Sequence, residues 1–281
     1  MSEKVTAPAI LARKGGKKIA MITAYDAPTA RIADRAGADI ILVGDSLGNV
    51  VLGYDDTLSV TVDIMVRHTA AVTRTKPRAL VVGDMPWLSY HLSAADSVRN
   101  AARFIVEGGA SAVKLEGGRK RIPMIEAILA AEIPVMGHLG LTPQSVHAMG
   151  GFKVQAKLAE AARELVDDAR ALAAAGVFSL VLEGIPDIVA AEVTNAVPVP
   201  TIGIGAGPRC DGQVLVFHDV LGLSAGPPPK FVRRYADLSD EATAAIRRFF
   251  DDVVSGAFPS EAETYHMSEA DAREFIAGRR G

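Results

Sequence analysis

Cysteine is almost absent from this sequence, and its scarcity limits the chemistry available to the chain. Cys210 is the only cysteine among 281 residues, so an intramolecular disulfide and a zinc site built from several thiolates are both excluded. No histidine and asparagine arrangement accompanies Cys210, and we interpret it as a structural residue. A reducing compartment is the simplest inference, and we expect a cytoplasmic protein.

The sequence also lacks long apolar runs and a strong excess of charge of either sign. No stretch approaches the ~18 uninterrupted apolar residues of a membrane span, and Met1 to Lys18 contains no apolar run of signal-peptide length. The formal net charge of −3 provides no basic field for nucleic acid or an anionic membrane, and the basic residues from Arg13 to Lys18 are interpreted as a solvated surface. We expect a protein that is not secreted and that has neither a membrane nor a nucleic acid as a partner.

The sequence does contain a regular alternation of short apolar runs with longer Ala-rich segments of helical period. The eight predicted strands are Lys18–Tyr25, Asp39–Asp45, Ala79–Asp84, Ala112–Glu116, Pro134–His138, Ser179–Glu183, Val199–Gly203 and Gly212–His218. The predicted helices are Pro28–Ala36, Val62–Thr75, Ala94–Glu107, Ile122–Ala131, Ala156–Ala175, Pro186–Ala196 and Asp240–Val254. Nearly continuous Val/Ile/Leu runs, such as Ile40 to Val43, are typical of parallel strands covered on both faces.

Eight strands favour closure into a barrel, with an open doubly wound sheet as the alternative. The predicted fold class is α/β, a single (βα)8 TIM-type barrel with a short N-terminal segment and an extra C-terminal helix. We expect one catalytic domain over residues 1–281, with a core at about 18–258 and an extension at about 259–281. Within the extension, a capping box at Ser268 to Asp271 predicts a short helix.

Polar side chains stand where five of the apolar runs end, at Asp45, Asp84, Glu116, His138 and Glu183. The carboxyl ends of the strands of a βα barrel form one rim, which is where active sites lie. An Asp at a strand end often only starts a turn or caps a helix, but a set of five weakens that explanation. Asp45, Asp84 and Glu116 together offer hard oxygen ligands, which indicate Mg²⁺ or Mn²⁺ rather than zinc.

Lys114 and Glu116 are two residues apart on one strand, so both side chains point to the same face, which we expect to be the barrel interior. A buried ion pair is one explanation; the other is that Lys114 meets a substrate carboxylate or a developing oxyanion. His138 is either a satisfied core histidine or a hydrogen-bond donor to substrate. Glu183 is the carboxylate least needed for a metal and is the candidate general base.

The glycine run from Ile202 to Gly207 resembles a phosphate-binding loop but lacks a dinucleotide-binding context. Barrels do bind phosphate near strands seven and eight, so this interpretation stays open. Tight packing at the barrel end is the favoured explanation.

The chain resembles the ketopantoate hydroxymethyltransferase family over about Met21 to Pro259. The segments that carry the resemblance are Met21 to Asp26, Val43 to Ser46, Asp84 to Pro86, Val113 to Gly118, Gly137 to Ser145, Gly151 to Gln155, Gly203 to Gly207 and Cys210 to Val216. One departure lies at Gly184 and Ile185, where family members often have a Cys or similar residue and then Val before the Pro, and the carboxylate of Glu183 is unaffected by it.

The resemblance implies a hydroxymethyl transfer from 5,10-methylenetetrahydrofolate to the 2-oxo acid 3-methyl-2-oxobutanoate through a metal-stabilised enolate, giving 2-dehydropantoate for pantothenate and coenzyme A synthesis. Asp45 and Asp84 would bind Mg²⁺ or another divalent cation, and with it the substrate. Glu116 would reach the metal directly or through water. Ser46 and Lys114 would hold the oxo acid.

The resemblance also implies that His138 hydrogen-bonds in the site and that Glu183 accepts the C3 proton. The folate is expected to cover the mouth of the barrel, because an enolate exposed to water would be quenched. A homo-oligomer, commonly a decamer, is implied as well.

Two other interpretations stay open. One is a lyase of the phosphoenolpyruvate mutase type, although those enzymes use a cysteine-bearing catalytic loop that is not evident in this sequence. The other is a catalytically silent barrel with a regulatory or assembly role, which would not need these polar residues together on one rim. Titration with Mg²⁺ and a 2-oxo acid separates the silent barrel from an enzyme.

Overall fold

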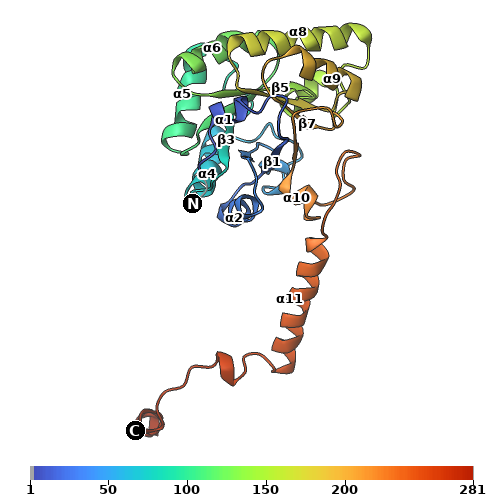
Figure 1. Ribbon diagram of the computed structural model, residues 1–281. Helices are drawn as coiled ribbons and strands as arrows, with labels where there is room; N and C mark the ends of the chain where they lie inside the picture. The colour runs from blue at the N-terminus through green and yellow to red at the C-terminus, as the bar shows by residue number, and fades with distance from the viewer. Residues whose placement is uncertain (1–2, 281) are drawn as a thin grey trace. The chain divides into compact units, whose positions relative to one another are not determined.

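Eight parallel strands close into a barrel in the computed structural model, which describes residues 3 to 280 (Figure 1). The strands are β1 (Ile19–Thr23), β2 (Ile40–Val43), β3 (Leu80–Asp84), β4 (Ala112–Glu116), β5 (Val135–Gly140), β6 (Ser179–Glu183), β7 (Thr201–Ile204) and β8 (Gly212–Leu215). Each strand pairs with the next along the chain, and β8 pairs with β1, where Val214 lies opposite Met21. The (βα)8 barrel is therefore confirmed and the open sheet is wrong.

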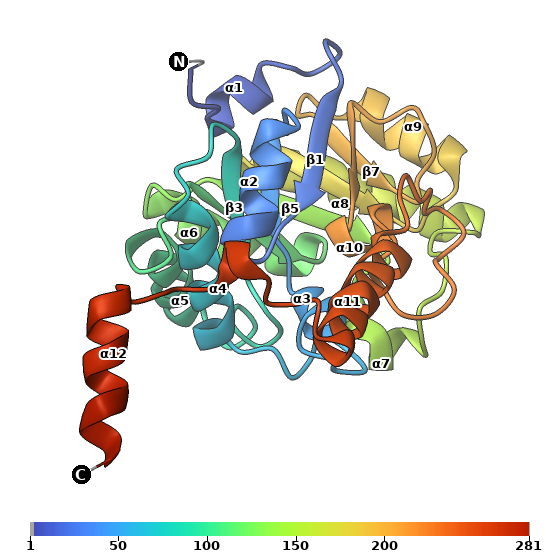
Figure 2. The ribbon, with the colours of Figure 1, turned by 90° about the horizontal axis from the view of Figure 1, so that it is seen from below.

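Helices connect most of the strands and lie outside them (Figure 2). They are α2 (Ala27–Arg35), α3 (Leu47–Val50), α4 (Val62–Thr73), α5 (Ala94–Val106), α6 (Ile122–Ala130), α7 (Val146–Met149), α8 (Ala159–Ala175), α9 (Asp187–Ala196) and α10 (Phe217–Val220), with 3-10 turns η1 (Arg119–Arg121) and η2 (Pro143–Ser145). Capping residues in the local sequence fix where some of these helices begin. The side chain of Asp26 caps α2 and that of Ser93 caps α5. No helix stands between β7 and β8, which residues 205–211 join.

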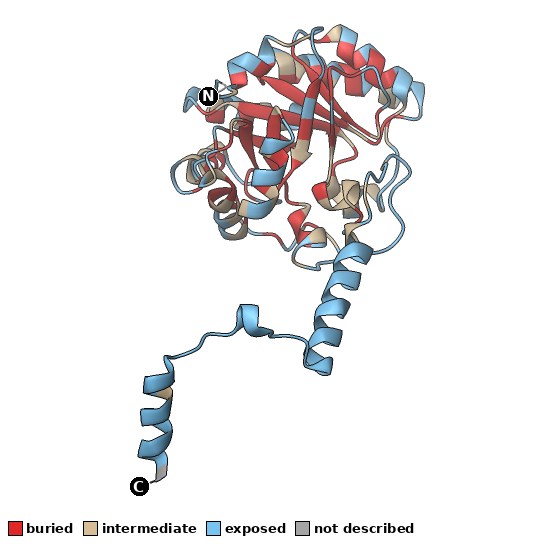
Figure 3. Cartoon of the chain, turned by 60° about the horizontal axis from the view of Figure 1, so that its bottom comes forward, coloured by how far each residue is buried: buried red, intermediate tan, exposed pale blue. Residues whose placement is uncertain are grey.

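Two apolar layers stabilise the barrel, one inside it and one between its strands and the helices. The inner layer contains Ile19, Met21 and Val214, and the outer layer contains residues of the opposite parity, such as Ile41 and Val81. The strands β2, β3 and β4 are buried along their whole length. Figure 3 shows that the buried colour predominates in the strands of the barrel. This burial explains why their sequences are apolar runs rather than alternating patterns.

The N-terminal segment closes one end of the inner layer. Helix α1 (Ala7–Leu11) is capped by Thr6 and packs the fully buried Ile10 into the same cluster as the inward side chains of β1. Next to it, the carboxylate of Asp211 accepts hydrogen bonds from the backbone N–H groups of Gly15 and Thr201, each at 2.9 Å, and pairs with Lys14 Nζ at 2.9 Å. Asp211 thus ties the N-terminal segment to the starts of β7 and β8.

Replacement of Asp211 by alanine is expected to lower the free energy of unfolding by about 1–3 kcal/mol, because the buried N–H of Thr201 loses its acceptor. Urea titration of the full chain measures the change. The exposed Asp55, changed to alanine in the same way, is the matched control and should lose much less stability. Equal losses in the two variants would contradict the tying role.

The stabilisation that the Asp211 carboxylate provides depends on pH. Burial raises the pKa of Asp211, but hydrogen bonds from Thr201, Lys14 and Gly15 outweigh burial and hold the pKa below its usual 3.8. Because the folded-state pKa is depressed, the stabilisation is complete above pH 3.8 and is lost as the pH falls through the folded-state pKa. The difference in unfolding midpoint between the wild type and Asp211→Asn should therefore shrink as the pH falls below this value.

The structure moves some predicted boundaries. Helix α8 begins at Ala159 rather than at Ala156, which has a left-handed φ of 53° that no α-helix accepts, and the neighbouring Gln155 donates its N–H to the carbonyl of Gly184. The eighth strand ends at Leu215, and the rest of the segment predicted as strand leads into α10. The short helices α1, α3, α7 and α10 were not predicted.

The chain divides into two compact units, Met1–Arg234 and Tyr235–Gly281, of which the first contains the barrel. This boundary lies before residue 258, the predicted end of the core. The second unit contains α11 (Leu238–Ser255), η3 (Glu261–Glu263), α12 (Glu269–Ala277) and η4 (Gly278–Arg280). The predicted cap is present, since the Ser268 side chain accepts from the N–H of Asp271.

None of the helices formed by the described residues has the length and apolar character needed to cross a membrane.

Candidate active site

The polar side chains at the strand ends meet at one cavity of about 140 Å³, at the carboxyl end of the barrel. It is lined by Thr23, Leu42, Asp45, Ser46, Asp84, Lys114, Glu116, His138, Pro143, Val181, Glu183, Ile204, Val214, Leu215, Val216, Asp219 and Phe231. All the residues predicted for the site are among them. The cavity therefore combines an apolar wall with a cluster of charges drawn from five successive strands.

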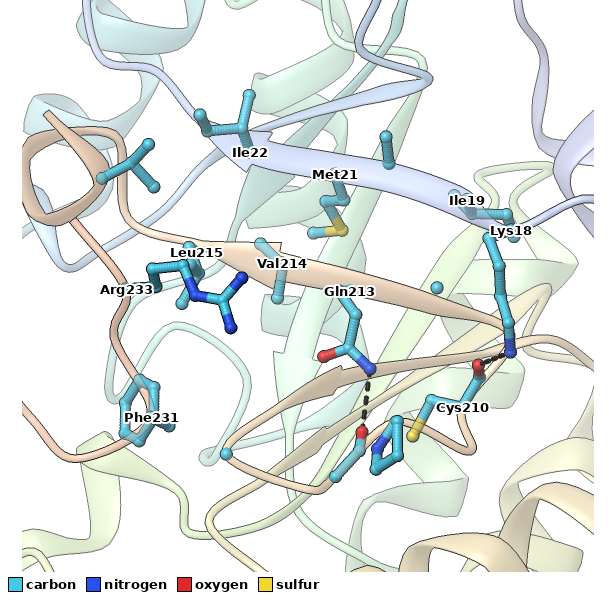
Figure 4. A pocket seen from close by; sticks show the side chains of 16 residues that line it. Lys18, Ile19, Met21, Ile22, Cys210, Gln213, Val214, Leu215, Phe231 and Arg233 are labelled. Carbon is cyan, nitrogen blue, oxygen red and sulfur yellow. Dashed lines mark hydrogen bonds between the residues drawn. The ribbon is translucent and has the colours of Figure 1, made fainter. Parts of the chain in front are cut away.

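A larger hollow of about 830 Å³ lies along β1 and β8 (Figure 4). Its lining includes the outward side chains Ala20, Ile22 and Gln213 of these strands, and Cys210 lies at one end. The hollow contains none of the predicted carboxylates. We therefore place the chemistry in the smaller cavity, where the titratable groups converge.

Lys114 is a buried cation between carboxylates. Its Nζ lies 2.9 Å from Asp84 Oδ1 and 3.8 Å from Glu116 Oε1, so its nearer partner comes from the adjacent strand β3. Burial lowers the pKa of Lys114, but the charges of Asp84 and Glu116 outweigh it and leave the pKa above its usual value. Lys114 is thus held charged, with Asp84 and Lys114 side by side in the register of β3 and β4.

The site has more negative charge than its own cations readily balance. Burial, and then the charges of Asp84 and Glu116, raise the pKa of Asp45 well above its usual value. Burial also raises the pKa of Asp84, against the opposing charge of Lys114. A divalent cation between buried carboxylates would relieve this repulsion, so the donor set fits Mg²⁺.

The described residues contain no group of three or more His, Cys, Asp or Glu side chains placed as a ready-made metal cage. Mg²⁺ commonly keeps several waters and binds proteins through one or two carboxylates. Of the three predicted ligands, Glu116 has both oxygens engaged: Oε2 accepts from the N–H of Gln144 at 3.1 Å and Oε1 lies 3.3 Å from His138 Nδ1. Asp84 is engaged in the same way, since its Oδ1 lies 2.9 Å from Lys114 Nζ and its Oδ2 accepts from the N–H of Asp45 at 3.2 Å. Asp45 differs, because among the described residues only its Oδ2 accepts a side-chain hydrogen bond, from Gln144.

His138 stands between two glutamates. Its Nδ1 faces Glu116 and its Nε2 lies 3.3 Å from Glu183 Oε2. Burial and the charge of Lys114 lower the pKa of His138, but contacts with both glutamates outweigh them and raise the pKa to about 9. His138 is therefore more than a satisfied core histidine, because it connects the predicted base to the predicted metal site.

A glycine allows Glu183 its position. Gly140 lies opposite Glu183 in the register of β5 and β6 and has a φ of 96°. A Cβ at Gly140 would lie 2.3 Å from the carbonyl oxygen of Glu183, so any side chain would push the strand end away. The glycine thus sets how closely the end of β5 approaches the predicted base.

Sequence reasoning missed the residues that support the site. Ser46 Oγ is 2.9 Å from the hydroxyl of the buried Tyr25, whose backbone oxygen in turn contacts His68 Nδ1 at 2.6 Å. Gln144 and Tyr90 hydrogen-bond to each other and to the carboxylate-bearing strands. Tyr25 and Gln144 lie in segments that carry the family resemblance, but no charge marked them as part of the site.

The contacts of the glycine run and the burial of Cys210 indicate structural roles for both. A Cβ at Gly207 would lie 2.5 Å from Cβ of Asp187, so the loop packs directly on the start of α9, as the packing interpretation expects. Cys210 is buried and free, and it lies outside the cavity of the carboxylates. No cysteine-bearing loop lines that cavity.

Comparison with known proteins places this site in a family. A family model described as ketopantoate hydroxymethyltransferase matches residues 4–261. The chain is 56% identical over 280 residues to the 3-methyl-2-oxobutanoate hydroxymethyltransferase of Koribacter versatilis, covering 99% of this chain and 95% of the relative. It is 57% identical over 257 residues to the protein of that name from Syntrophomonas wolfei, covering 92% of this chain and 93% of the relative.

Solved structures show the same fold at low identity. Phosphonopyruvate hydrolase in complex with oxalate and Mg²⁺ has a TM-score of 0.59 at 15% identity, covering 98% of this chain and 95% of that one. The 2,3-dimethylmalate lyase, a member of the PEP mutase/isocitrate lyase superfamily, has a TM-score of 0.58 at 18% identity and covers 99% of each chain. These likenesses concern the fold, whereas the family model and the relatives extend over nearly the whole sequence. The chain belongs to the ketopantoate hydroxymethyltransferase family.

Proposed function

We propose that this protein transfers a hydroxymethyl group from 5,10-methylenetetrahydrofolate to 3-methyl-2-oxobutanoate, giving 2-dehydropantoate for pantothenate and coenzyme A synthesis. The observation that carries the proposal is the convergence of Asp45, Asp84, Lys114, His138 and Glu183 on one cavity at the carboxyl end of the barrel. Family membership supports the choice of substrates. A catalytically silent barrel would have no need for this convergence of buried charges.

Asp45 and Asp84 would hold Mg²⁺, or another hard divalent cation, with Glu116 in contact through water. When bound, such a cation acts as a Lewis acid on the keto and carboxylate oxygens of a 2-oxo acid and makes the C3 proton removable. A protein of similar fold, phosphonopyruvate hydrolase, was solved in complex with oxalate and Mg²⁺, which agrees with a cation in this proposal.

The chain's own residues bind and activate the substrate. Ser46 and Lys114 hold the oxo acid, and Glu183 accepts the proton from C3. The charge that then develops on the keto oxygen is stabilised by the buried ammonium of Lys114, which acts in surroundings from which water is largely excluded. His138 positions Glu183 by its contact at 3.3 Å.

The second substrate supplies the carbon. The bond from the methylene carbon to N10 of the folate breaks, and the enolate attacks that carbon to form the new carbon–carbon bond. Water then replaces N5 on the same carbon and provides the hydroxyl oxygen of the product, and tetrahydrofolate leaves with N5 and N10 protonated by the proton from C3 and one proton of the water. The apolar wall of the cavity, with Val181, Ile204 and Val214, suits the branched aliphatic part of the oxo acid. The folate would cover the mouth and protect the enolate from water.

The direct test is to incubate the full chain with 3-methyl-2-oxobutanoate, Mg²⁺ and 5,10-methylenetetrahydrofolate and to measure 2-dehydropantoate by mass spectrometry. Product should form only when all three are present. Omission of Mg²⁺ together with a chelator is the control for the cation. Absence of product from the folded, complete mixture would contradict the proposed function.

Replacement of Asp84 by asparagine should weaken Mg²⁺ binding and lower turnover together, because the shape is kept while a negative charge is removed. A change beside a metal ligand costs about 10- to 100-fold in affinity or activity, so a change of the ligand itself should cost at least as much. Titration of activity with Mg²⁺ measures the effect, and Asp55→Asn, at an exposed position, is the control. Unchanged metal dependence would remove Asp84 from the ligands.

Two further properties remain part of the proposal. We propose a homo-oligomer, supported by the exposed outward side chains Ala20 and Gln213 of β1 and β8, and ultracentrifugation of the full chain tests it. A cytoplasmic location is supported by the single, reduced cysteine.

A further inference from the structure

Gln144 is a neutral residue at the centre of the charged site. Its side chain is 4% exposed, and it lies in the turn η2 that follows β5. Its Nε2 donates to Asp45 Oδ2 at 2.9 Å and to the carbonyl oxygen of Met85 at 3.0 Å, while its Oε1 accepts from the hydroxyl of Tyr90. The backbone N–H of Gln144 donates to Glu116 Oε2 at 3.1 Å. One residue therefore contacts two of the predicted carboxylates.

These contacts fix the orientation of the amide. If Oε1 and Nε2 exchanged places, Oε1 would face two acceptors, Asp45 Oδ2 and the carbonyl of Met85, and two hydrogen bonds would become repulsions. Tyr90 adds to the constraint, because its hydroxyl also accepts from the N–H of Glu116 at 3.2 Å. The donor of Gln144 is thus held against Asp45 by three surrounding contacts.

The fixed amide of Gln144 makes the two carboxylate oxygens of Asp45 unequal. Oδ2 is occupied by the amide, whereas no residue of the described chain donates a hydrogen bond to Oδ1. An amide donor orients a carboxylate without neutralising its charge, in contrast to Lys114, which places a full positive charge 2.9 Å from Asp84 Oδ1. Asp45 therefore has one oxygen held by the amide, a fixed carboxylate plane and one free oxygen.

We propose that Gln144 positions Asp45 for the divalent cation, by holding one carboxylate oxygen so that the other is presented to the metal in a single orientation. This inference rests on the proposed function, because it concerns the same metal site. Gln144 is a positioning residue that acts through Asp45, and its backbone N–H holds Glu116 independently of its side chain.

The test measures cation binding directly, with Mn²⁺ alone as the probe and free Mn²⁺ followed by electron paramagnetic resonance on the full chain. Gln144→Met keeps the length of the side chain but removes its donor and acceptor. The affinity for Mn²⁺ should fall by about 10- to 100-fold, as expected when an orienting neighbour of a ligand is lost. In activity assays the Mg²⁺ concentration for half-activation should rise by the same factor, while turnover at saturating Mg²⁺ falls much less.

The matched control is Gln155→Met, since Gln155 also donates its Nε2 to a backbone carbonyl, that of Lys153 at 2.7 Å, but does not line the cavity of the carboxylates. Its Mn²⁺ affinity should equal that of the wild type. Wild-type Mn²⁺ affinity in a folded Gln144→Met protein would overturn the inference and leave the proposed function intact. No Mn²⁺ binding by the wild type, with or without 3-methyl-2-oxobutanoate, would overturn both.

If Gln144→Met does not fold, Tyr90→Phe replaces it, because this change removes the hydroxyl that donates to Oε1 of Gln144 and accepts from the backbone N–H of Glu116. Loss of the hydrogen bond to Gln144 should weaken Mn²⁺ binding in the same direction by about two- to tenfold. An unchanged affinity in a folded Tyr90→Phe protein would then overturn the inference.

Discussion

Replacement of Glu183 by glutamine is expected to lower turnover by about 10²- to 10⁴-fold, the contribution of a positioned general base. The side chain keeps its size and its place beside His138 Nε2, at 3.3 Å in the wild type, so the oxo acid and Mg²⁺ should bind nearly as before. Only proton removal should suffer. Steady-state kinetics together with calorimetric binding of 3-methyl-2-oxobutanoate separate the two effects.

Proton removal can also be measured alone, by following enolisation of the oxo acid without folate. In D₂O without folate, the wild type should exchange deuterium into C3 of 3-methyl-2-oxobutanoate, and Glu183→Gln should hardly do so. The exposed Glu164 on α8, changed to glutamine, is the control and should exchange at the wild-type rate. Wild-type exchange by Glu183→Gln with impaired product formation would assign Glu183 to carbon transfer and would rule it out as the base.

The sequence was sufficient for the barrel and for the charged residues of the site because both follow from local pattern. Apolar runs of strand length repeated eight times, and five of them ended in a carboxylate or a histidine. Parallel closure then brings all strand ends to one rim, so Asp84 and Glu183 meet although they are distant in sequence. The convergence was a consequence of topology, which the strand count had already indicated.

Partners within the site could not be predicted in the same way. Spacing along β4 suggested an ion pair between Lys114 and Glu116, but the register between strands places Lys114 opposite Asp84, which is its closer partner. Gln144 was missed for a related reason. It lies in a 3-10 turn whose conformation depends on contacts with other segments, and an uncharged amide gives no signal of a site until its neighbours are known.

The sequence does not predict a helix boundary correctly where contacts with other segments force the backbone out of regular structure. Ala156 reads as a good helix former, yet it is left-handed because the chain before α8 bonds to the end of β6.

Replacement of Lys114 by methionine is expected to weaken binding of 3-methyl-2-oxobutanoate and to lower turnover by a further factor of about 10²–10³, as when a preorganised donor to a developing oxyanion is removed. Methionine keeps much of the length of the buried stem, so packing around β4 changes little. Folate affinity should hardly change, because Lys114 lies deep in the cavity among Asp84, Glu116 and His138. Binding of each substrate measured separately, together with single-turnover rates, checks these three expectations.

Stability must be followed in the same variant, because loss of Lys114 leaves buried carboxylates without their cation and breaking a buried pair costs about 3–5 kcal/mol. Saturating Mg²⁺ should restore part of this loss in Lys114→Met, since Asp45 and Asp84 would gain a compensating charge, and thermal unfolding with and without Mg²⁺ measures it. The exposed Lys120, changed to methionine, is the control and should show neither effect. If folate binding collapsed in a folded Lys114→Met protein while binding of the oxo acid held, Lys114 would face the second substrate, and the assignment of the two substrates to the inner and outer parts of the cavity would have to be reversed.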